Sequence, residues 1–412
     1  MLRIIFHFII ILLLTGTGCT SNESQHETKE TPSSFENTNN QGDQINNYKL
    51  KNATDNEVTN KDEEAQQNEP SKEEQQLTTE EPKKPGKKDV KGIYLNRNSI
   101  KDENIETYID LVKSSNLNAV VIDIKDDYGK LSYDSNVDRV DEVGSDSDPT
   151  VADLQSFIQR LKEEDIYTIA RIVTFKDPYL AEHKNEFALK RKDGTIWSDK
   201  AGVKWIDPYK MEIWEYVTDI AVEVAEFGID EIQYDYIRFP ENAKQVDQEV
   251  AYDNPDNLEK SDAITNFLAV SKEKLAHYPV YVSTDVFGLV TTAENDMGIG
   301  QIWEKISPVV DYISPMTYPS HYAPNTYGIA NPDEHPYDLM KKAMQDAKAR
   351  NEKLKENGEN PAIIRPWIQD FDYKSIYTEE DVRNQIKAIE EEGITQYLLW
   401  NAKNEYTKAA FS

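Results

Sequence analysis

The stretch Glu231-Ile-Gln-Tyr-Asp-Tyr-Ile-Arg-Phe-Pro240 decides the fold of this chain. Its β-branched and aromatic residues predict a buried parallel strand, along which side chains alternate between two faces. Gln233 and Asp235 therefore share one face, and we expect Pro240 to end the ladder of backbone hydrogen bonds. A buried ionised Asp is costly unless it is paired. Asp235 is thus either a structural partner of Arg238 or a functional group at the end of its strand.

Seven more segments rich in β-branched and aromatic residues occur before and after this stretch. Segments whose apolar residues recur at helical spacing separate them. The predicted strands are 91–95, 119–124, 167–175, 231–239, 280–287, 312–318, 362–368 and 396–400. The predicted helices are 103–114, 151–164, 211–227, 262–277, 336–353 and 379–392. This alternation predicts an α/β fold, a (β/α)8 TIM barrel over residues 89–412. An open doubly wound sheet is the alternative, but no GxGxxG or P-loop motif follows any strand.

The first 18 residues have the layout of a lipoprotein signal peptide, with Arg3, an apolar run over 4–14, and small residues before Cys19. Cys19 would then carry a lipid that anchors the protein to the outer face of the cell membrane. An uncleaved membrane anchor is the alternative, although the apolar run is shorter than the roughly 20 residues that span a bilayer. Both interpretations place the rest of the chain outside the cytoplasm. The polar residues 19–88 predict a disordered linker.

The formal net charge is −30, and most of it belongs to residues 89–412 rather than to the linker. A negative field of this size disfavours nucleic acid as a partner. Neutral or cationic sugars remain compatible with it. Adaptation to salty surroundings explains the charge equally well.

Polar and aromatic residues gather at the predicted strand ends, which meet at one mouth of a barrel. Asp235 and Asp285, on neighbouring strands, can supply the paired carboxylates that glycoside cleavage needs. Aromatic faces suit sugar rings, and amide and ammonium groups suit hydroxyls. The candidate substrate-binding residues at and after these ends are Asp123, Lys125, Arg171, Gln233, Arg238, Asp296, Tyr318, His321, Arg365, Trp367, Gln369, Asp370, Trp400 and Asn401.

Other enzyme classes need residues or motifs that this sequence does not contain. The histidines 183, 277, 321 and 335 are scattered, which argues against a zinc deacetylase, and no GxSxG motif is present for a serine hydrolase. The pair Asp126-Asp127 fits a solvated loop better than a calcium site. We therefore expect no metal and no cofactor. The long segment 176–209 is predicted to wall the mouth, although Trp197 and Trp205 could equally be packing residues.

Several motifs support a resemblance to a known family. They are Val121-Ile-Asp-Ile-Lys-Asp-Asp127, Ala170-Arg-Ile-Val-Thr-Phe-Lys-Asp177, Trp205-Ile-Asp-Pro208, Gln233-Tyr-Asp-Tyr-Ile-Arg-Phe-Pro240, Asp285-Val-Phe-Gly288, Asp296-Met-Gly-Ile-Gly-Gln301, Tyr312-Ile-Ser-Pro-Met-Thr-Tyr-Pro-Ser-His321, Arg365-Pro-Trp-Ile-Gln-Asp-Phe371 and Leu399-Trp-Asn401. From about residue 92 to 406 the chain resembles a family of bacterial extracytoplasmic barrels classed as glycoside hydrolases, distantly similar to α-amylase and chitinase-type barrels.

The resemblance implies a TIM barrel that hydrolyses an extracellular or cell-wall polysaccharide. Asp235 matches the strand-four Asp that amylase-like barrels use as nucleophile. Strand five carries Asp285 where those relatives have Glu, which leaves Asp296 and Asp370 as other candidates for the proton donor. A separation of about 5 Å between the carboxyls of Asp235 and Asp285 would indicate a retaining mechanism, and about 6.5–9.5 Å an inverting one.

A different class of function stays open. A surface lipoprotein could bind glycan in a barrel groove without cleaving it, and lyase or transglycosidase activity would use similar residues. Loss of reducing-end release on substitution of Asp235 separates the hydrolase from the binding protein.

Overall fold

The computed structural model describes residues 83, 84, 86 and 89–412. The predicted signal peptide, Cys19 and almost all of the predicted linker lie outside the described residues. No helix in the described part is long and apolar enough to cross a membrane. The first barrel strand begins at Lys91, close to the predicted start of the folded domain.

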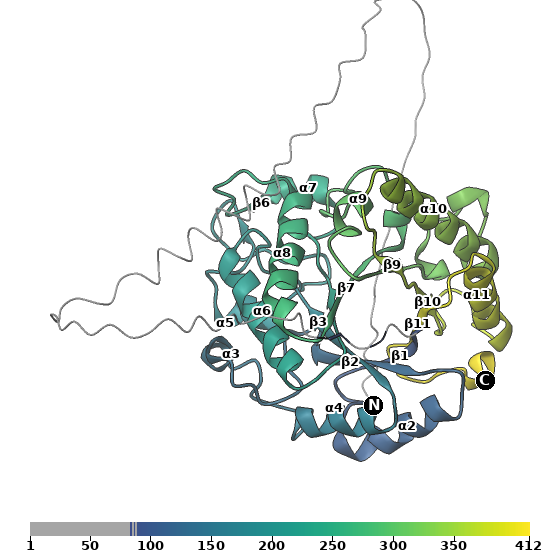
Figure 1. Cartoon of the computed structure of the whole chain (residues 1–412). Helices are drawn as coiled ribbons and strands as arrows, with labels where there is room; N and C mark the ends of the chain where they lie inside the picture. Colours follow the sequence, from purple (N-terminus) through teal and green to yellow (C-terminus); the bar gives the residue numbers. More distant parts are fainter. Residues whose placement is uncertain (1–82, 85, 87–88) are drawn as a thin grey trace, which may run out of the picture. The chain divides into compact units, whose positions relative to one another are not determined.

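Parallel strands close into a barrel that Figure 1 shows nearly end-on, as the sequence predicts. The chain of pairings runs β10-β11-β1-β2-β3-β5-β7-β8-β9, and a contact between β10 and β8 closes it. The barrel strands are β1 (Lys91–Leu95), β2 (Ala119–Lys125), β3 (Tyr167–Val173), β5 (Glu231–Asp235), β7 (Tyr281–Phe287), β8 (Tyr312–Met316), β9 (Ile363–Ile364), β10 (Trp367–Gln369) and β11 (Tyr397–Trp400). β9 and β10 together fill the place of the seventh strand, which gives eight positions in all.

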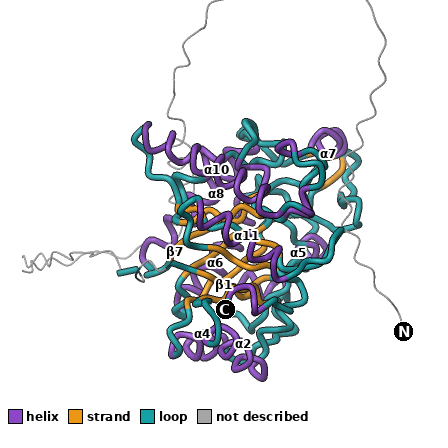
Figure 2. Tube along the Cα trace, turned by 90° about the vertical axis from the view of Figure 1, so that its right-hand side faces the viewer, coloured by secondary structure: helices purple, strands orange, loops and turns teal. Residues whose placement is uncertain are grey.

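Helices surround the strands, and Figure 2 shows the strands at the centre from the side. Their apolar faces pack on the barrel, which is why the 3.6-residue spacing predicted them. The helices are α2 (Ile105–Lys113), α3 (Asp138–Val143), α4 (Leu154–Glu163), α5 (Pro178–His183), α6 (Met211–Glu226), α7 (Ala243–Glu249), α8 (Lys260–Lys274), α9 (Trp303–Ile306), α10 (Pro336–Glu356) and α11 (Glu379–Glu391). Thr378 and Asp381 form a capping box that starts α11.

Two strands differ most from their predicted bounds. β5 ends at Asp235 rather than near Pro240, because the next residue, Tyr236, has φ +50° and turns the chain out of the ladder. The seventh strand is interrupted between Ile364 and Trp367, where Pro366 has no N–H to donate.

The segment between β3 and β5 contains α5 and a short strand β4 (Lys190–Arg191), which pairs with β6 (Val250–Ala251). Trp197 and Trp205 are buried in a small apolar cluster with Leu189, Val246 and Val250. For these two Trp residues the structure thus favours the packing alternative. The segment still reaches the mouth, since Trp205 lies against Arg238 and Tyr236.

Candidate active site

Asp235 occupies the last position of β5, at the carboxyl end of the barrel where the residues of TIM-barrel active sites lie. The backbone N–H of Tyr236 donates to Asp235 Oδ1 at 2.6 Å. Tyr236 itself has φ +50°, a costly conformation for a bulky residue and one that clusters at functional sites. The turn after β5 therefore fixes the orientation of the carboxylate.

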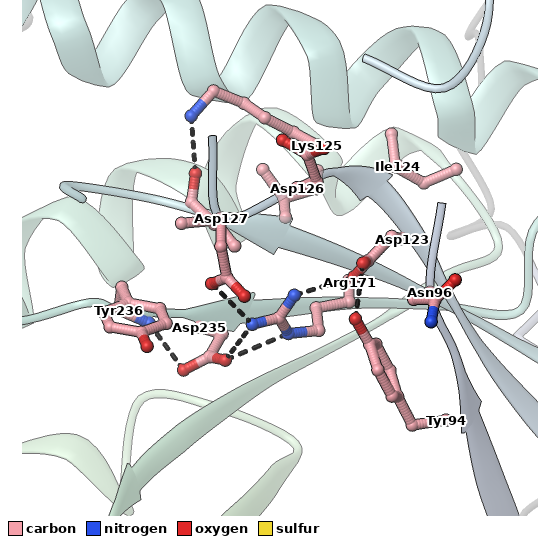
Figure 3. Close-up of polar contacts among 12 residues, drawn as sticks. Tyr94, Asn96, Asp123, Ile124, Lys125, Asp126, Asp127, Arg171, Asp235 and Tyr236 are labelled. Carbon is pink, nitrogen blue, oxygen red and sulfur yellow. Dashed lines mark hydrogen bonds and ion pairs between the residues drawn. The ribbon is translucent and has the colours of Figure 1, made fainter. Parts of the chain in front are cut away.

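Arg171, from β3, is the centre of the site (Figure 3). Its Nε and Nη2 donate to Asp235 Oδ2 at 2.9 and 2.6 Å, and its Nη1 donates to Asp123 Oδ1 at 2.7 Å. A third carboxylate, Asp127, accepts from Nη2 at 3.2 Å. One buried guanidinium thus holds three acidic side chains, and the alternative pairing of Asp235 with Arg238 is wrong. Arg238 instead forms an ion pair with Glu241 at 3.0 Å.

The three carboxylates differ in their electrostatics. Burial raises the pKa of Asp123 to about 7 against the opposing charge of Arg171, and the hydroxyl of Tyr94 donates to Asp123 at 2.6 Å. For Asp127 burial also opposes ionisation, but Arg171 and Lys176 together hold its pKa below the usual range. The side chain of Asp127 is 35% exposed, whereas those of Asp123 and Asp235 are buried.

Asp285, from β7, accepts a hydrogen bond from Trp367 Nε1 on Oδ1 at 2.7 Å. Burial is the main cause that raises the pKa of Asp285, and the nearby negative charge of Asp235 raises it further. Asp235, by contrast, accepts only N–H donors, two of them from a cation, and such contacts favour a carboxylate. The mouth therefore places a carboxyl group whose pKa is raised beside one that is held by N–H donors, and acid/base chemistry uses such a contrast between two acids.

Aromatic rings line the same end of the barrel. Trp400 stacks on Tyr94 with centroids 4.0 Å apart and meets Trp367 edge-on at 5.5 Å. The guanidinium of Arg171 lies over both Tyr94 and Trp400, at 5.4 and 5.3 Å from their centroids. Tyr318, on the other side of Trp400, has its centroid 6.5 Å away. These predicted aromatic residues thus share one neighbourhood with the acidic cluster.

Arg365 lies elsewhere, which corrects its prediction as a substrate ligand. It is fully buried and pairs with Glu231, the first residue of β5, so it sits at the opposite end of the barrel interior. Tyr167 donates to the same carboxylate at 3.1 Å, and the ring of Tyr312 lies under the guanidinium. Alternation along a strand predicts which face a side chain lies on, but not how far along the barrel axis it lies. Arg365 was therefore predicted at the mouth, although it lies near the opposite end of the barrel.

Lys125 also departs from its prediction. A register shift between Asp123 and Lys125 sets Lys125 opposite Ile172, on the other face of the strand from Asp123. Its ammonium is fully buried and contacts Asp177 and the carbonyl of Val173, each at 2.7 Å. In Figure 3 the side chain points away from Arg171. Lys125 therefore holds the loop after β3 and offers no hydroxyl partner at the mouth.

Two more predicted ligands use their polar groups within the protein. Gln369 accepts from the N–H of Ser320 at 3.1 Å and donates to the carbonyl of Phe371 at 3.0 Å. Asn401 donates to the carbonyls of Asp370 and Glu405 at 2.5 and 2.6 Å. These side chains fix the loops of the mouth, and the structure corrects their prediction as direct hydroxyl partners.

Neither substitute for the proton donor joins the cluster. Asp370 accepts from both the N–H and the hydroxyl of Thr407, at 2.8 and 2.7 Å, and so fastens the C-terminal segment. Asp296 accepts from the N–H of Gly298 at 2.8 Å in a turn. Asp285 is the better candidate because it lies beside Asp235, on the neighbouring strand β7, whereas Asp370, whose pKa burial also raises, does not.

The remaining predicted residues lie around these groups. Gln233 is buried one layer below Asp235, with Nε2 3.4 Å from the hydroxyl of Ser314. Arg238 is buried between the rings of Trp205 and Phe287, at 4.9 and 4.4 Å from their centroids. His321 is solvent-exposed after β8.

Asp127 and Tyr94 are the residues of the acidic cluster that sequence reasoning did not include. Asp127 stands four residues after Asp123, beyond the strand, where alternation no longer predicts direction. Tyr94 lies in a short, mostly apolar strand, and nothing in that sequence distinguishes it from a packing residue. Within the described residues, no group of three or more His, Cys, Asp or Glu side chains could hold a metal ion.

The fold and the site together define the class of protein. It is a closed (β/α)8 barrel with two neighbouring carboxylic groups, those of Asp235 and Asp285, at the carboxyl-terminal end of its strands. The chain belongs to the family described as "Putative glycosyl hydrolase domain", whose model matches residues 92–406. This confirms the resemblance drawn from the motifs. A search of curated proteins finds no match.

Several solved structures are similar to this chain, and the first named here supports the architecture. The glycoside hydrolase domain of PgaB (BpsB) from Bordetella bronchiseptica is 13% identical, with a TM-score of 0.53 over 76% of this chain and 94% of that chain. A hypothetical protein from Ruminiclostridium thermocellum is 35% identical over 46% of this chain and 96% of its own, with a TM-score of 0.41. The spore cortex-lytic enzyme SleL from Bacillus cereus is 13% identical, with a TM-score of 0.47 over 78% of this chain and 73% of that chain.

Proposed function

We propose that this protein is a glycoside hydrolase that cleaves glycosidic bonds of an extracellular or cell-wall polysaccharide. Asp285 donates a proton to the glycosidic oxygen, and Asp235 attacks the anomeric carbon or activates the water that does so. The observation that carries the proposal is the contrast between these two acids. Burial raises the pKa of Asp285, while Arg171 and a backbone N–H donate hydrogen bonds to Asp235.

Arg171 is a positioning residue in this scheme. It fixes Asp235 through two donors and is itself held by Asp123 and Asp127. Such a planar fork orients a carboxylate more strictly than a lysine could. The rings of Trp400 and Tyr318 offer apolar faces for a sugar at the same mouth.

The proposed location follows from the sequence before the described residues. A lipid on Cys19 would anchor the protein to the outer face of the cell membrane, and residues 20–88 would give the barrel reach into the surrounding polysaccharide. Addition of radiolabelled palmitate to growing cells tests this anchor. The label is expected on the parent protein and absent from a Cys19→Ala variant.

The experiment that tests the activity measures reducing ends released from a panel of cell-wall and exopolysaccharide preparations. Asp235→Asn and Asp285→Asn are each expected to lower kcat by about 10²–10⁴-fold, the usual contribution of a general acid or base. Glu163→Gln, on the exposed surface of α4, is the matched control and should retain activity. Glycan binding without release by the parent protein would reject the hydrolase and favour a binding protein.

A further inference from the structure

A continuous series of aromatic rings leads from the catalytic acid to the protein surface. Trp367, whose indole N–H bonds Asp285, meets Trp400 at 5.5 Å between centroids. Trp400 is followed by Tyr318 at 6.5 Å, and Tyr318 by His321 at 5.4 Å. The series begins in the buried core of the barrel and moves outward to the solvent-exposed His321.

The outermost step joins His321 to Tyr373, with centroids 5.7 Å apart and ring planes inclined by 29°. Tyr373 is 49% exposed, so a ligand from solvent can contact it. Phe371 supports the pair from below, at 6.0 Å from His321 and 5.7 Å from Tyr318. We call His321, Phe371 and Tyr373 the aromatic shelf.

The shelf is built on fixed loops. The loop after β8 and the loop after β10 are joined by Gln369, which accepts from the N–H of Ser320 and donates to the carbonyl of Phe371. Lys374 donates to the carbonyl of Ser320 at 2.7 Å, and the N–H of Ser375 bonds Asp333 at 2.8 Å. Rings held in this way bind a flat ligand with little loss of conformational entropy.

We propose that the aromatic shelf is a distal subsite for the same glycan whose bond is cut between Asp235 and Asp285. The occupant is a sugar ring, because the C–H face of a pyranose packs against the negative face of an aromatic ring. Four successive ring contacts, with centroids 5.4–6.5 Å apart, link Trp367 to Tyr373 through Trp400, Tyr318 and His321, and in this proposal different sugar units lie at the two ends of the series. The substrate is therefore a chain of several sugars, which rests on the proposed hydrolase function.

The continuous series of rings favours a glycan over a protein as the ligand of the aromatic shelf. A docking face for another protein would have no reason to continue inward to the indole that bonds Asp285. The shelf instead shares its loops with Tyr318 and Gln369, which border the mouth. It would bind the glycan at a fixed distance from the scissile bond.

The test compares chain lengths. For a ladder of oligosaccharides from the hydrolysed polysaccharide, the ratio of kcat/KM between long and short chains is expected to fall about tenfold in Tyr373→Ala, equivalent to roughly 1.4 kcal/mol. Tyr373→Phe should keep the ratio, because the ring remains. Ile376→Ala, which removes another exposed apolar side chain from the same loop, is the matched control. An unchanged ratio in Tyr373→Ala, or an equal fall in Ile376→Ala, would overturn the proposal.

A second measurement separates this inference from the proposed function. Binding of full-length Asp235→Asn protein to insoluble chitin, chitosan and peptidoglycan does not require turnover. Adding Tyr373→Ala to this variant should weaken binding to the retained polysaccharide about tenfold, while adding Ile376→Ala should not. Binding that depends on Tyr373, with no reducing ends released by the parent protein, would keep the subsite and reject only the hydrolase.

Discussion

Substitution of Arg365 by Met tests whether this residue belongs to the interior of the barrel or to the substrate. The Arg365 Nη1 atom lies 3.0 Å from Glu231 Oε2, and both side chains have no exposed surface. At an effective dielectric constant of about 20, Coulomb's law gives about 5–6 kcal/mol for unit charges at that distance. Removal of one partner from a buried pair typically costs about 3–5 kcal/mol, because the other charge stays behind.

We therefore expect Arg365→Met to lower the free energy of unfolding by about 3–5 kcal/mol, measured by urea denaturation followed through Trp fluorescence. The loss should depend on pH. Without its partner, the buried Glu231 would have a folded-state pKa above its unfolded value, so the folded state binds the extra proton. The stability deficit should then grow as pH rises above the unfolded pKa of about 4.3.

The double variant Glu231→Gln/Arg365→Met is the matched control. It removes both charges and leaves Tyr167 and Ser283 as hydroxyl partners for the amide. Its deficit should be smaller than that of Arg365→Met and should vary little with pH, because no unpaired charge is buried. An unchanged unfolding free energy in Arg365→Met, together with a raised KM for glycan, would refute the interior assignment and restore Arg365 as a ligand.

Two further predictions concern the mouth and the loop beside it. Because the pKa of Asp285 is raised, the rate of hydrolysis should fall as pH rises through that value, and a pH–rate profile that falls only on the acidic side would contradict this. Gly129→Ala should destabilise the fold by about 3–5 kcal/mol, since the new Cβ would lie 1.9 Å from Asp177 Oδ1 and displace the buried partner of Lys125. Gly194→Ala, at a similar positive φ in open space, should cost only about 1–2 kcal/mol in the same denaturation assay, and equal losses would count against the explanation.

The fold could be predicted from the sequence because each element repeats one physical pattern. Helix α6 covers Met211–Glu226, one residue short of its predicted end, since its apolar residues recur at helical spacing. Strand β1 has the predicted bounds of Lys91–Leu95. The predicted end of a strand was wrong where a single backbone angle determines that end. The positive φ of Tyr236, for example, ends β5 earlier than predicted.

The site could be predicted only in part. Asp235 and Asp285 were found because strand ends converge at one mouth. Lys125 was misplaced because a bulge reverses its face, which no periodicity records. Asp127 was missed because a loop residue has no fixed direction, so only the coordinates bring it to Arg171. Which charged groups pair with each other depends on distances in the folded protein. These pairs determine the electrostatics of the site, so the sequence alone does not predict them.

The most direct test of the central claim is a crystal structure of Asp235→Asn in complex with an oligosaccharide that the parent protein cleaves. The account predicts the glycosidic oxygen within hydrogen-bonding distance of the Asp285 carboxyl group, and the anomeric carbon facing residue 235. A glycan bound away from both side chains, with Asp235 and Asp285 still covered by protein, would contradict it.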